Sequence, residues 1–169
     1  MTACSACRCD RHYYDYLSEA PPKDRICGIW VIDPDRTDWA EAKPLLEDGS
    51  IGPQRGRLQI SPDGRFDIED LPDFSKFHRG PIAPHLSASG GWQIKFDVMT
   101  ERVYLWLEFD KVDGRSTEDK VATIRFLCEG EEYFLHVTIR DPDQGDALVM
   151  RKSENPPKAS PDTDEKPSN

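Results

Sequence analysis

Short segments of alternating apolar and polar residues, separated by tight turns, set the strictest limit on how this chain can fold. RLQIS and RFDIED alternate with period two on either side of PDG, which is a strong turn signal. Such alternation predicts strands that bury one face. The apolar residues on one side of this predicted hairpin are Leu58, Ile60, Phe66 and Ile68.

The same pattern continues along the chain. Further strands are predicted at 26–33, 91–98, 102–110, 120–128, 132–140 and 147–152. About eight strands joined mainly by local turns are typical of an antiparallel meander. Closing such a meander into a barrel buries the shared apolar face and removes both sheet edges. We therefore expect an all-β fold, an antiparallel up-and-down barrel of about eight strands, with a two-sheet sandwich as the alternative.

The predicted inward face carries large side chains, which favours a mostly filled interior. These inward residues are Leu58, Phe66, Trp92, Phe96, Leu105, Leu107, Phe126, Tyr133 and Leu135. A barrel of this size either fills with side chains or holds one small molecule. The alternative to a filled interior is an apolar pocket at an open end, closed by the irregular loop 71–90 with its Phe74 and Phe77.

The barrel is expected to span 26–152, between two appendages. Residues 1–25 predict a Cys-rich arm, and 153–169 predict a disordered tail because that segment has no core-forming residues. One short helix is expected within 37–50, capped by Thr37 or Asp38 and interrupted by Pro44.

Charge and hydropathy narrow the classes of partner. The net charge of −10 argues against nucleic acid, because binding phosphates needs a clustered basic surface. No run approaches the roughly 18 to 20 apolar residues of a membrane-spanning helix. A complete signal peptide is also not found at the start of the sequence.

The two ends of the predicted barrel share a further pattern. Gly28-Ile29-Trp30 opens the first strand, and Arg151 closes the last. This is similar to the lipocalin and calycin pattern, in which Gly-x-Trp packs under a basic side chain at the end of the barrel. The resemblance implies a structural clasp of Gly28, Trp30 and Arg151. A guanidinium over an indole contributes about 0.5–2 kcal/mol.

A narrower resemblance covers 26–152. The segments GIWV, RLQISPDGRFDIEDLP, SGGWQIKF and DPDQGDALVMRK look like those of a group of uncharacterised bacterial proteins. Those proteins are regarded as small lipocalin-like barrels, often secreted or lipid-anchored. The resemblance implies the fold and an extracytoplasmic location, and it carries over no chemistry.

Two interpretations compete at the N-terminal cysteines. Cys4, Cys7, Cys9 and His12 offer four soft ligands of the kind that zinc prefers, but they crowd into nine residues, so no metal site is expected. Thr2-Ala3-Cys4 resembles the end of a bacterial lipobox, with Cys4 as the lipidated residue. The protein would then be anchored outside the cytoplasm, and it would be cytoplasmic if Met1 is the true start.

Catalytic candidates are few. His136 has the phase of the outer face, and His78 and His85 belong to the long loop. Ser75 and Ser87 lie near these two histidines but lack the context of a nucleophile elbow. Neither an enzyme nor a cofactor is expected. Residues expected nearest a recognition surface are Phe74, Phe77, Trp92, Tyr104 and Trp106.

The sequence therefore predicts a non-enzymatic, lipocalin-like barrel that binds a small apolar ligand or a protein partner. The alternative is a fully packed barrel that acts through its outer surface as an interaction or immunity-type protein. Tyr104 and Trp106 point outward in this prediction and would favour the alternative if they are exposed.

Overall fold

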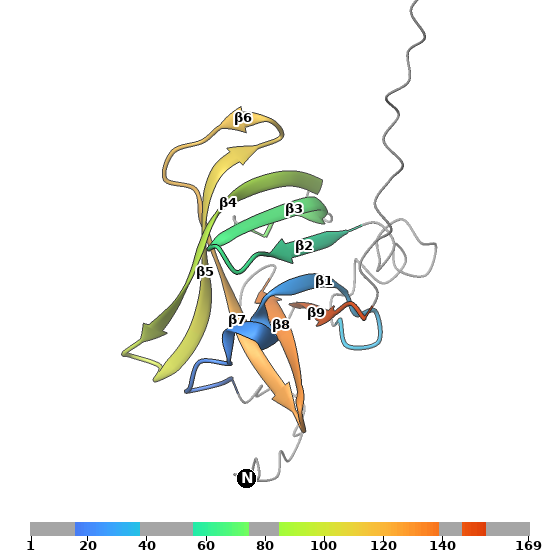
Figure 1. Cartoon of the computed structure of the whole chain (residues 1–169), viewed down its shortest axis with the longest axis vertical. Coiled ribbons are helices and arrows are strands. Elements are labelled where there is room, and N and C mark those ends of the chain that lie inside the picture. The colour runs from blue at the N-terminus through green and yellow to red at the C-terminus, as the bar shows by residue number, and fades with distance from the viewer. Residues whose placement is uncertain (1–15, 38–55, 75–84, 139–146, 155–169) are drawn as a thin grey trace, which may run out of the picture.

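The chain folds into a closed antiparallel barrel of eight strands with one extra strand and one short helix (Figure 1). This computed structural model describes residues 16–37, 56–74, 85–138 and 147–154. The predicted all-β up-and-down barrel is confirmed, and the two-sheet alternative is not needed.

The described elements follow one another with few excursions. They are α1 (Lys23–Ile26), β1 (Gly28–Ile32), β2 (Arg57–Ile60), β3 (Arg65–Pro72), β4 (His85–Asp97), β5 (Arg102–Val112), β6 (Arg115–Ser116), β7 (Val121–Glu129), β8 (Glu132–Thr138) and β9 (Ala147–Lys152).

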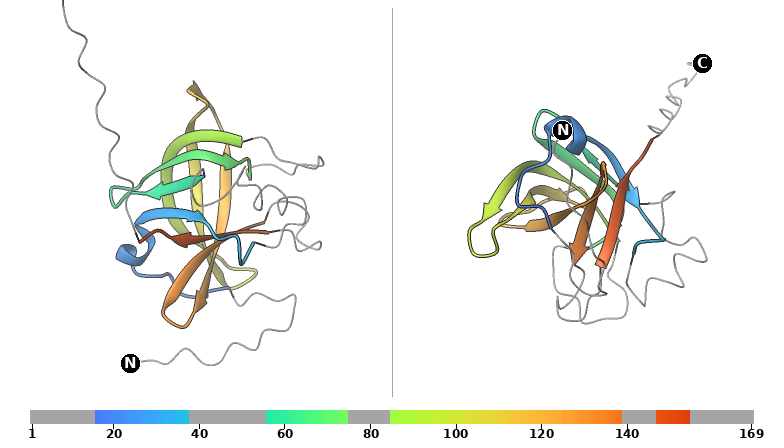
Figure 2. Two further views of the ribbon diagram at one scale, coloured as in Figure 1. Left: turned by 90° about the vertical axis from the view of Figure 1, so that its right-hand side faces the viewer. Right: turned by 90° about the horizontal axis from the view of Figure 1, so that it is seen from below.

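Each barrel strand pairs with its neighbours along the chain, and the ends of the meander meet. The order is β4-β3-β2-β1-β9-β8-β7-β5, and β4 pairs with β5 to close the ring. Strand β6 only extends β5 at one end of the barrel. The two views of Figure 2 show the closed ring from the side and from below.

The interior holds one contiguous hydrophobic cluster to which every barrel strand contributes. The predicted inward residues of the β2–β3 hairpin are all buried, with Leu58 opposite Ile68 and Ile60 opposite Phe66. The largest fully buried side chains are Trp30, Phe66, Phe126, Ile26, Ile32, Leu58, Ile60, Leu71, Leu105, Leu107, Ile124 and Leu135.

Strand β4 bends at Gly90, where the pairing with β5 shifts register. A Cβ atom at Gly90 would lie 1.9 Å from the main-chain oxygen of Glu108 and 2.8 Å from Phe66 Cε1. Only glycine lets the two strands approach this closely. The neighbouring Gly91 has no such contact, since its nearest neighbour would be 3.8 Å away.

The end of β4 and the beginning of β5 project from the barrel as a two-stranded hairpin (Figures 1 and 2). Pairing of β3 with β4 ends at Gly91, so the last residues of β4 pair only with β5. The prediction that Phe96 points into the core is therefore wrong. Its phase matches that of Trp92, but β4 has no β3 partner at this position, and Phe96 is 53% exposed.

The N-terminal boundary of the barrel also differs from the prediction. Ile26 was expected to begin the first strand, but it ends α1 and is fully buried. Tyr16 and Leu17 contact the barrel wall as well, so this part of the predicted arm joins the folded body. The predicted helix, residues 1–15 and most of the predicted tail lie outside the described residues.

Candidate functional site

The clasp at the end of the barrel uses Lys152 instead of Arg151. Trp30 is fully buried and donates its indole N–H to the carbonyl of Ile26 at 2.8 Å. Lys152 is its cross-strand partner, whereas Arg151 lies opposite Val31 and is exposed. Because side chains alternate between faces, Arg151 points away from Trp30, and the predicted Trp30–Arg151 clasp is wrong.

Lys152 joins the last strand to α1. Its ammonium donates to the carbonyls of Asp24 at 2.8 Å and Arg25 at 3.3 Å. Gly28 makes room for this side chain, since a Cβ at that position would meet Lys152 Cε at 2.6 Å. Gly28 also has a φ of +141°, which other residues rarely adopt. At this end of the barrel, Lys152 thus passes over Gly28 and links β9 to α1.

Two of the predicted recognition residues belong to the core. Phe74 and Trp92 are 9% and 8% exposed and lie in the main hydrophobic cluster. The Trp92 indole N–H donates to the Ser61 carbonyl at 2.8 Å, and Lys23 lies 5.7 Å from its ring centroid. Phe77 lies outside the described residues. Phe74 and Trp92 are therefore not available to line the predicted apolar pocket.

Tyr104 and Trp106 do lie on the outer face, as predicted, and both are partly exposed. With Lys95 and Arg125, which stack on their rings, they form what we call the Tyr104–Trp106 ladder. Their ring centroids are 6.4 Å apart. Lys95 lies 3.7 Å from the Trp106 centroid, and the Arg125 guanidinium lies 5.5 Å from that of Tyr104. Stacking covers part of each ring and holds the long cationic side chains in place.

A second hydrophobic cluster covers the outer face of β7, β8 and β9. It consists of Leu127, Phe134 and Val149, with Tyr16 against it. His136 belongs to the same face, as predicted, but it is only 3% exposed. Burial lowers the pKa of His136 to about 4. Sequence reasoning missed this cluster, although the unbroken apolar run ALVM in β9 signals a strand that is buried on both faces.

The tip of the β4–β5 hairpin carries the large hydrophobic side chains that stay exposed in the described chain. Phe96, Val98 and Met99 are 53%, 78% and 92% exposed. Asp97 fixes the turn, accepting the Met99 N–H at 3.0 Å and the Thr100 hydroxyl at 2.8 Å. Both bonds lower the pKa of the Asp97 carboxyl, and the bond from the Thr100 hydroxyl has the larger effect. The turn is preorganised while its apolar side chains face solvent.

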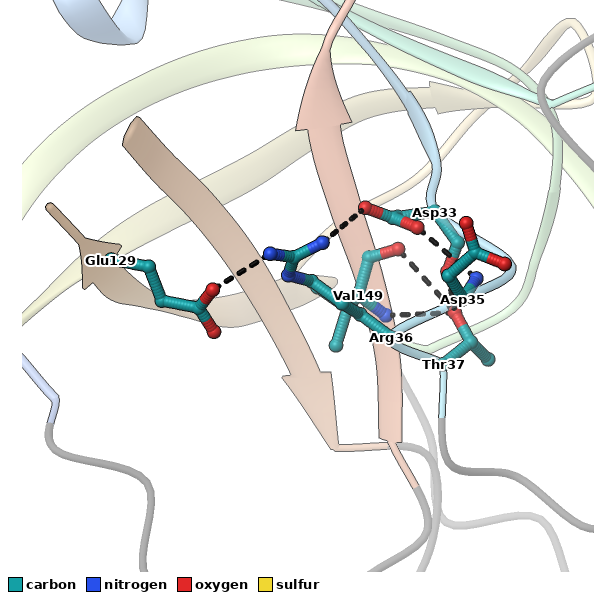
Figure 3. A network of polar contacts seen from close by, with 6 residues as sticks. All are labelled: Asp33, Asp35, Arg36, Thr37, Glu129 and Val149. Carbon is teal, nitrogen blue, oxygen red and sulfur yellow. Dashed lines mark hydrogen bonds and ion pairs between the residues drawn. The ribbon is translucent and has the colours of Figure 1, made fainter. Parts of the chain in front are cut away.

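A groove of about 410 Å³ beside β1, β8 and β9 is lined largely by charged side chains. Arg36 is one of its lining residues, and its guanidinium bonds Glu129 at 2.7 Å and Asp33 at 3.4 Å (Figure 3). Its guanidinium also lies 4.4 Å from the Phe134 centroid. Thr37 accepts the Val149 N–H at 3.2 Å beside it. Arg36 therefore ties the chain after β1 to β7 and β8, and the groove does not resemble an apolar ligand site.

His85, Asp70 and Ser87 lie close together and include the residue types of a catalytic triad. His85 begins β4 and bonds Asp70 at 2.9 Å through Nδ1. The nearby Ser87 hydroxyl accepts the N–H of Asp70 at 3.4 Å. A nucleophile must contact the base that activates it, and in the described part of the chain the Ser87 hydroxyl accepts from Asp70 and makes no hydrogen bond to His85. The three residues are better explained as a stabilised strand pairing between β3 and β4.

Cysteines offer no site in the described chain. Cys27 and Cys128 are partly buried, and they are not joined to each other in a disulfide. The candidate ligands Cys4, Cys7, Cys9 and His12 lie outside the described residues, as does Cys4 as a lipidation site. Within the described ranges, no group of three or more His, Cys, Asp or Glu could hold a metal ion.

Comparison with known proteins adds no relative: no family model, curated protein or solved structure matches this chain. Among the described residues, no helix has the length and apolar character needed to cross a membrane.

Proposed function

We propose that this protein is a non-catalytic binding protein that docks a protein partner on the outside of its barrel, at the β4–β5 hairpin. The observation that carries the proposal is the exposed tip formed by Phe96, Val98 and Met99. Burying one such side chain contributes about 1.5–3 kcal/mol. A partner that covers the tip would therefore gain several kcal/mol from these residues.

The surroundings of the tip support a protein as the partner. Tyr104 and Trp106 lie on the outer face of the same hairpin, with Lys95 beside them on β4, whereas Phe96 lies on its other face. Aromatic residues, Met and Arg are enriched at protein interfaces, and Met99 at the tip and Arg125 beside Tyr104 fit this composition. The bonds to Asp97 hold the turn before binding, so little conformational entropy is lost when a partner docks.

The interior supports the same choice over the predicted apolar ligand. Leu105, Leu107 and Phe126, which were expected to face inward, are fully buried in one continuous cluster. Trp92 adds a large ring whose indole N–H is already bonded. The resemblance to lipocalin-like proteins and the extracytoplasmic location stay predictions, and the proposed docking surface depends on neither.

Site-selective photocrosslinking tests this function. A photoreactive amino acid replaces Met99 at the tip in one version of the full chain. In the control version it replaces Glu118, which is exposed at the opposite end of β5. In cells that produce the protein, we expect one discrete protein adduct from position 99 and none from position 118. Val98→Asp added to the first version should abolish that adduct.

The same variant shows whether the tip serves the fold. Val98 is 78% exposed, so Val98→Asp should change the free energy of unfolding by less than about 0.5 kcal/mol. Equal adducts from positions 99 and 118, or an adduct that survives Val98→Asp, would contradict the proposal.

A further inference from the structure

The barrel wall opens where β5 and β7 diverge. Their ladder runs from Glu108 and Val121 to Tyr104 and Arg125, and it stops there. The next residues toward the hairpin tips, Val103 and Phe126, do not pair with each other. In Figure 1 the β4–β5 and β7–β8 hairpins spread apart below this point, and the blue N-terminal segment crosses the space between them.

Leu17 occupies this opening as a piece of strand would. Its N–H donates to the Phe126 carbonyl at 3.2 Å, and its carbonyl accepts the Val103 N–H at 2.9 Å. Tyr16 forms an antiparallel bridge with Leu127. We call this opening, with Val103 on one side and Phe126 and Leu127 on the other, the β5–β7 seam.

The seam offers a separate subsite to each side chain. Leu17 packs inward against the main core cluster. Tyr16 stays outside on the second cluster, with its ring centroid 5.4 Å from that of His136 and its hydroxyl 3.2 Å from His136 Nδ1. The Arg125 guanidinium lies 5.8 Å from the Tyr16 ring. The seam thus accommodates an aromatic residue followed by an aliphatic one.

On its C-terminal side, the chain's own segment leaves the barrel wall directly after Leu17. Residues 18–20 are exposed, and the next buried residue is Pro21. Segments near a chain end that are bordered by exposed residues can open locally at a free energy well below that of global unfolding. Opening would expose the Val103 N–H and the Phe126 carbonyl as a template for another strand.

We propose that the β5–β7 seam is a binding site for an extended protein segment with an aromatic–aliphatic pair, which Tyr16 and Leu17 of the same chain occupy until a partner displaces them. The seam borders the hairpin tip, because Arg125 also lies 3.6 Å from Asp97. The inference rests on the proposed function only in taking a protein as the occupant.

A peptide made from the chain itself is the probe. The full-length double variant Tyr16→Ser/Leu17→Ser frees the seam, and a labelled peptide YYDYLSEA, which copies 13–20, is titrated into it. We expect at least about tenfold tighter binding to the double variant than to the wild type, in which the chain's own segment competes. The control peptide YYDSSSEA should bind neither protein.

Two outcomes would overturn the inference. One is a folded double variant that binds both peptides equally or not at all, since Tyr16 and Leu17 would then be only structural. The other comes from amide exchange in the wild type. The Val103 amide should exchange at least about tenfold faster than that of Leu105, which lies within the β5–β7 ladder. Equal rates would mean that the seam opens only on global unfolding.

Peptide binding at the seam and crosslinking at the hairpin tip can fail independently of each other. Val98→Asp alters the hairpin tip and leaves Tyr16, Leu17 and their partners in place. Peptide binding that survives Val98→Asp would support the seam even if crosslinking at position 99 fails. Crosslinking at the tip without peptide binding would support the docking surface alone.

Discussion

At the scale of single residues, Lys152 has a larger structural role than its neighbour Arg151. Its ammonium bonds two carbonyls of α1, whereas Arg151 is exposed on the other face. We expect Lys152→Met, which keeps an apolar stem, to lower the free energy of unfolding by about 1 kcal/mol. Arg151→Met should change it by less than about 0.5 kcal/mol.

Urea titration followed by tryptophan fluorescence measures both variants, because Trp30 and Trp92 are buried. A larger loss for Arg151→Met than for Lys152→Met would restore the clasp expected from the resemblance. Two adjacent basic residues look equivalent in a sequence. Only the register of β9 against β1 decides which of them shares a face with Trp30.

His136 should make the stability depend on pH. Burial lowers its pKa from 6.5 to about 4, so the unfolded chain binds this proton more readily than the folded one. The free energy of unfolding is therefore unaffected by His136 protonation above pH 6.5, and it decreases as the pH falls from 6.5 toward about 4. Between pH 7 and 5 this loss amounts to about 2 kcal/mol.

The control is His136→Phe, which keeps a ring beside Tyr16 and cannot titrate. It also loses the bond to the Tyr16 hydroxyl, so its stability at pH 7 should be lower. Denaturant unfolding at both pH values should show a decline about 2 kcal/mol steeper in the wild type than in the variant. Parallel declines would mean that His136 is not the group responsible.

At the scale of elements, the bend of β4 depends on Gly90. Gly90→Ala places a methyl group against the Glu108 carbonyl, a main-chain atom that cannot move aside cheaply. We expect a loss of about 2–3 kcal/mol. Gly91→Ala is the matched control, because its methyl group would find 3.8 Å of space.

Thermal unfolding of the two alanine variants checks this prediction. Gly90→Ala should unfold well below the wild type, and Gly91→Ala should unfold close to it. If both unfold at the wild-type temperature, β4 and β5 do not need the close approach seen at their register shift.

Period-two alternation predicted the barrel strands well, because a strand with one buried face carries its own signal. Val103, Leu105, Leu107 and Phe109 on β5 are all buried, as expected. The pattern fails where burial departs from that rule. Phe96 keeps the inward phase beyond the end of the β3–β4 pairing and is exposed.

Strands β8 and β9 depart from alternation in the opposite direction. His136 is buried although its phase is outward, because Tyr16 covers it from a segment 120 residues away in the chain. Such contacts depend on tertiary packing, and their local signal is limited to the unbroken apolar run ALVM in β9. The other members of the second hydrophobic cluster and the β5–β7 seam could therefore not be derived from alternation.

At the scale of the whole molecule, the features suited to recognition lie on the outside. The interior is one hydrophobic cluster, whereas the exposed tip, the Tyr104–Trp106 ladder and the seam occupy neighbouring parts of β4, β5 and β7. The charged groove beside β1, β8 and β9 is lined by Arg36, whose guanidinium is bonded to Asp33 and Glu129. This distribution favours a barrel that acts through its surface.

The measurement that tests this account most directly is the mass of the purified full-length protein under native and denaturing conditions. Purification without harsh detergent would keep a small apolar molecule inside the barrel if the barrel holds one. The account predicts equal masses, because the interior is filled by the chain's own side chains. Loss of a few hundred daltons on denaturation would contradict it and make the barrel a carrier of a small ligand.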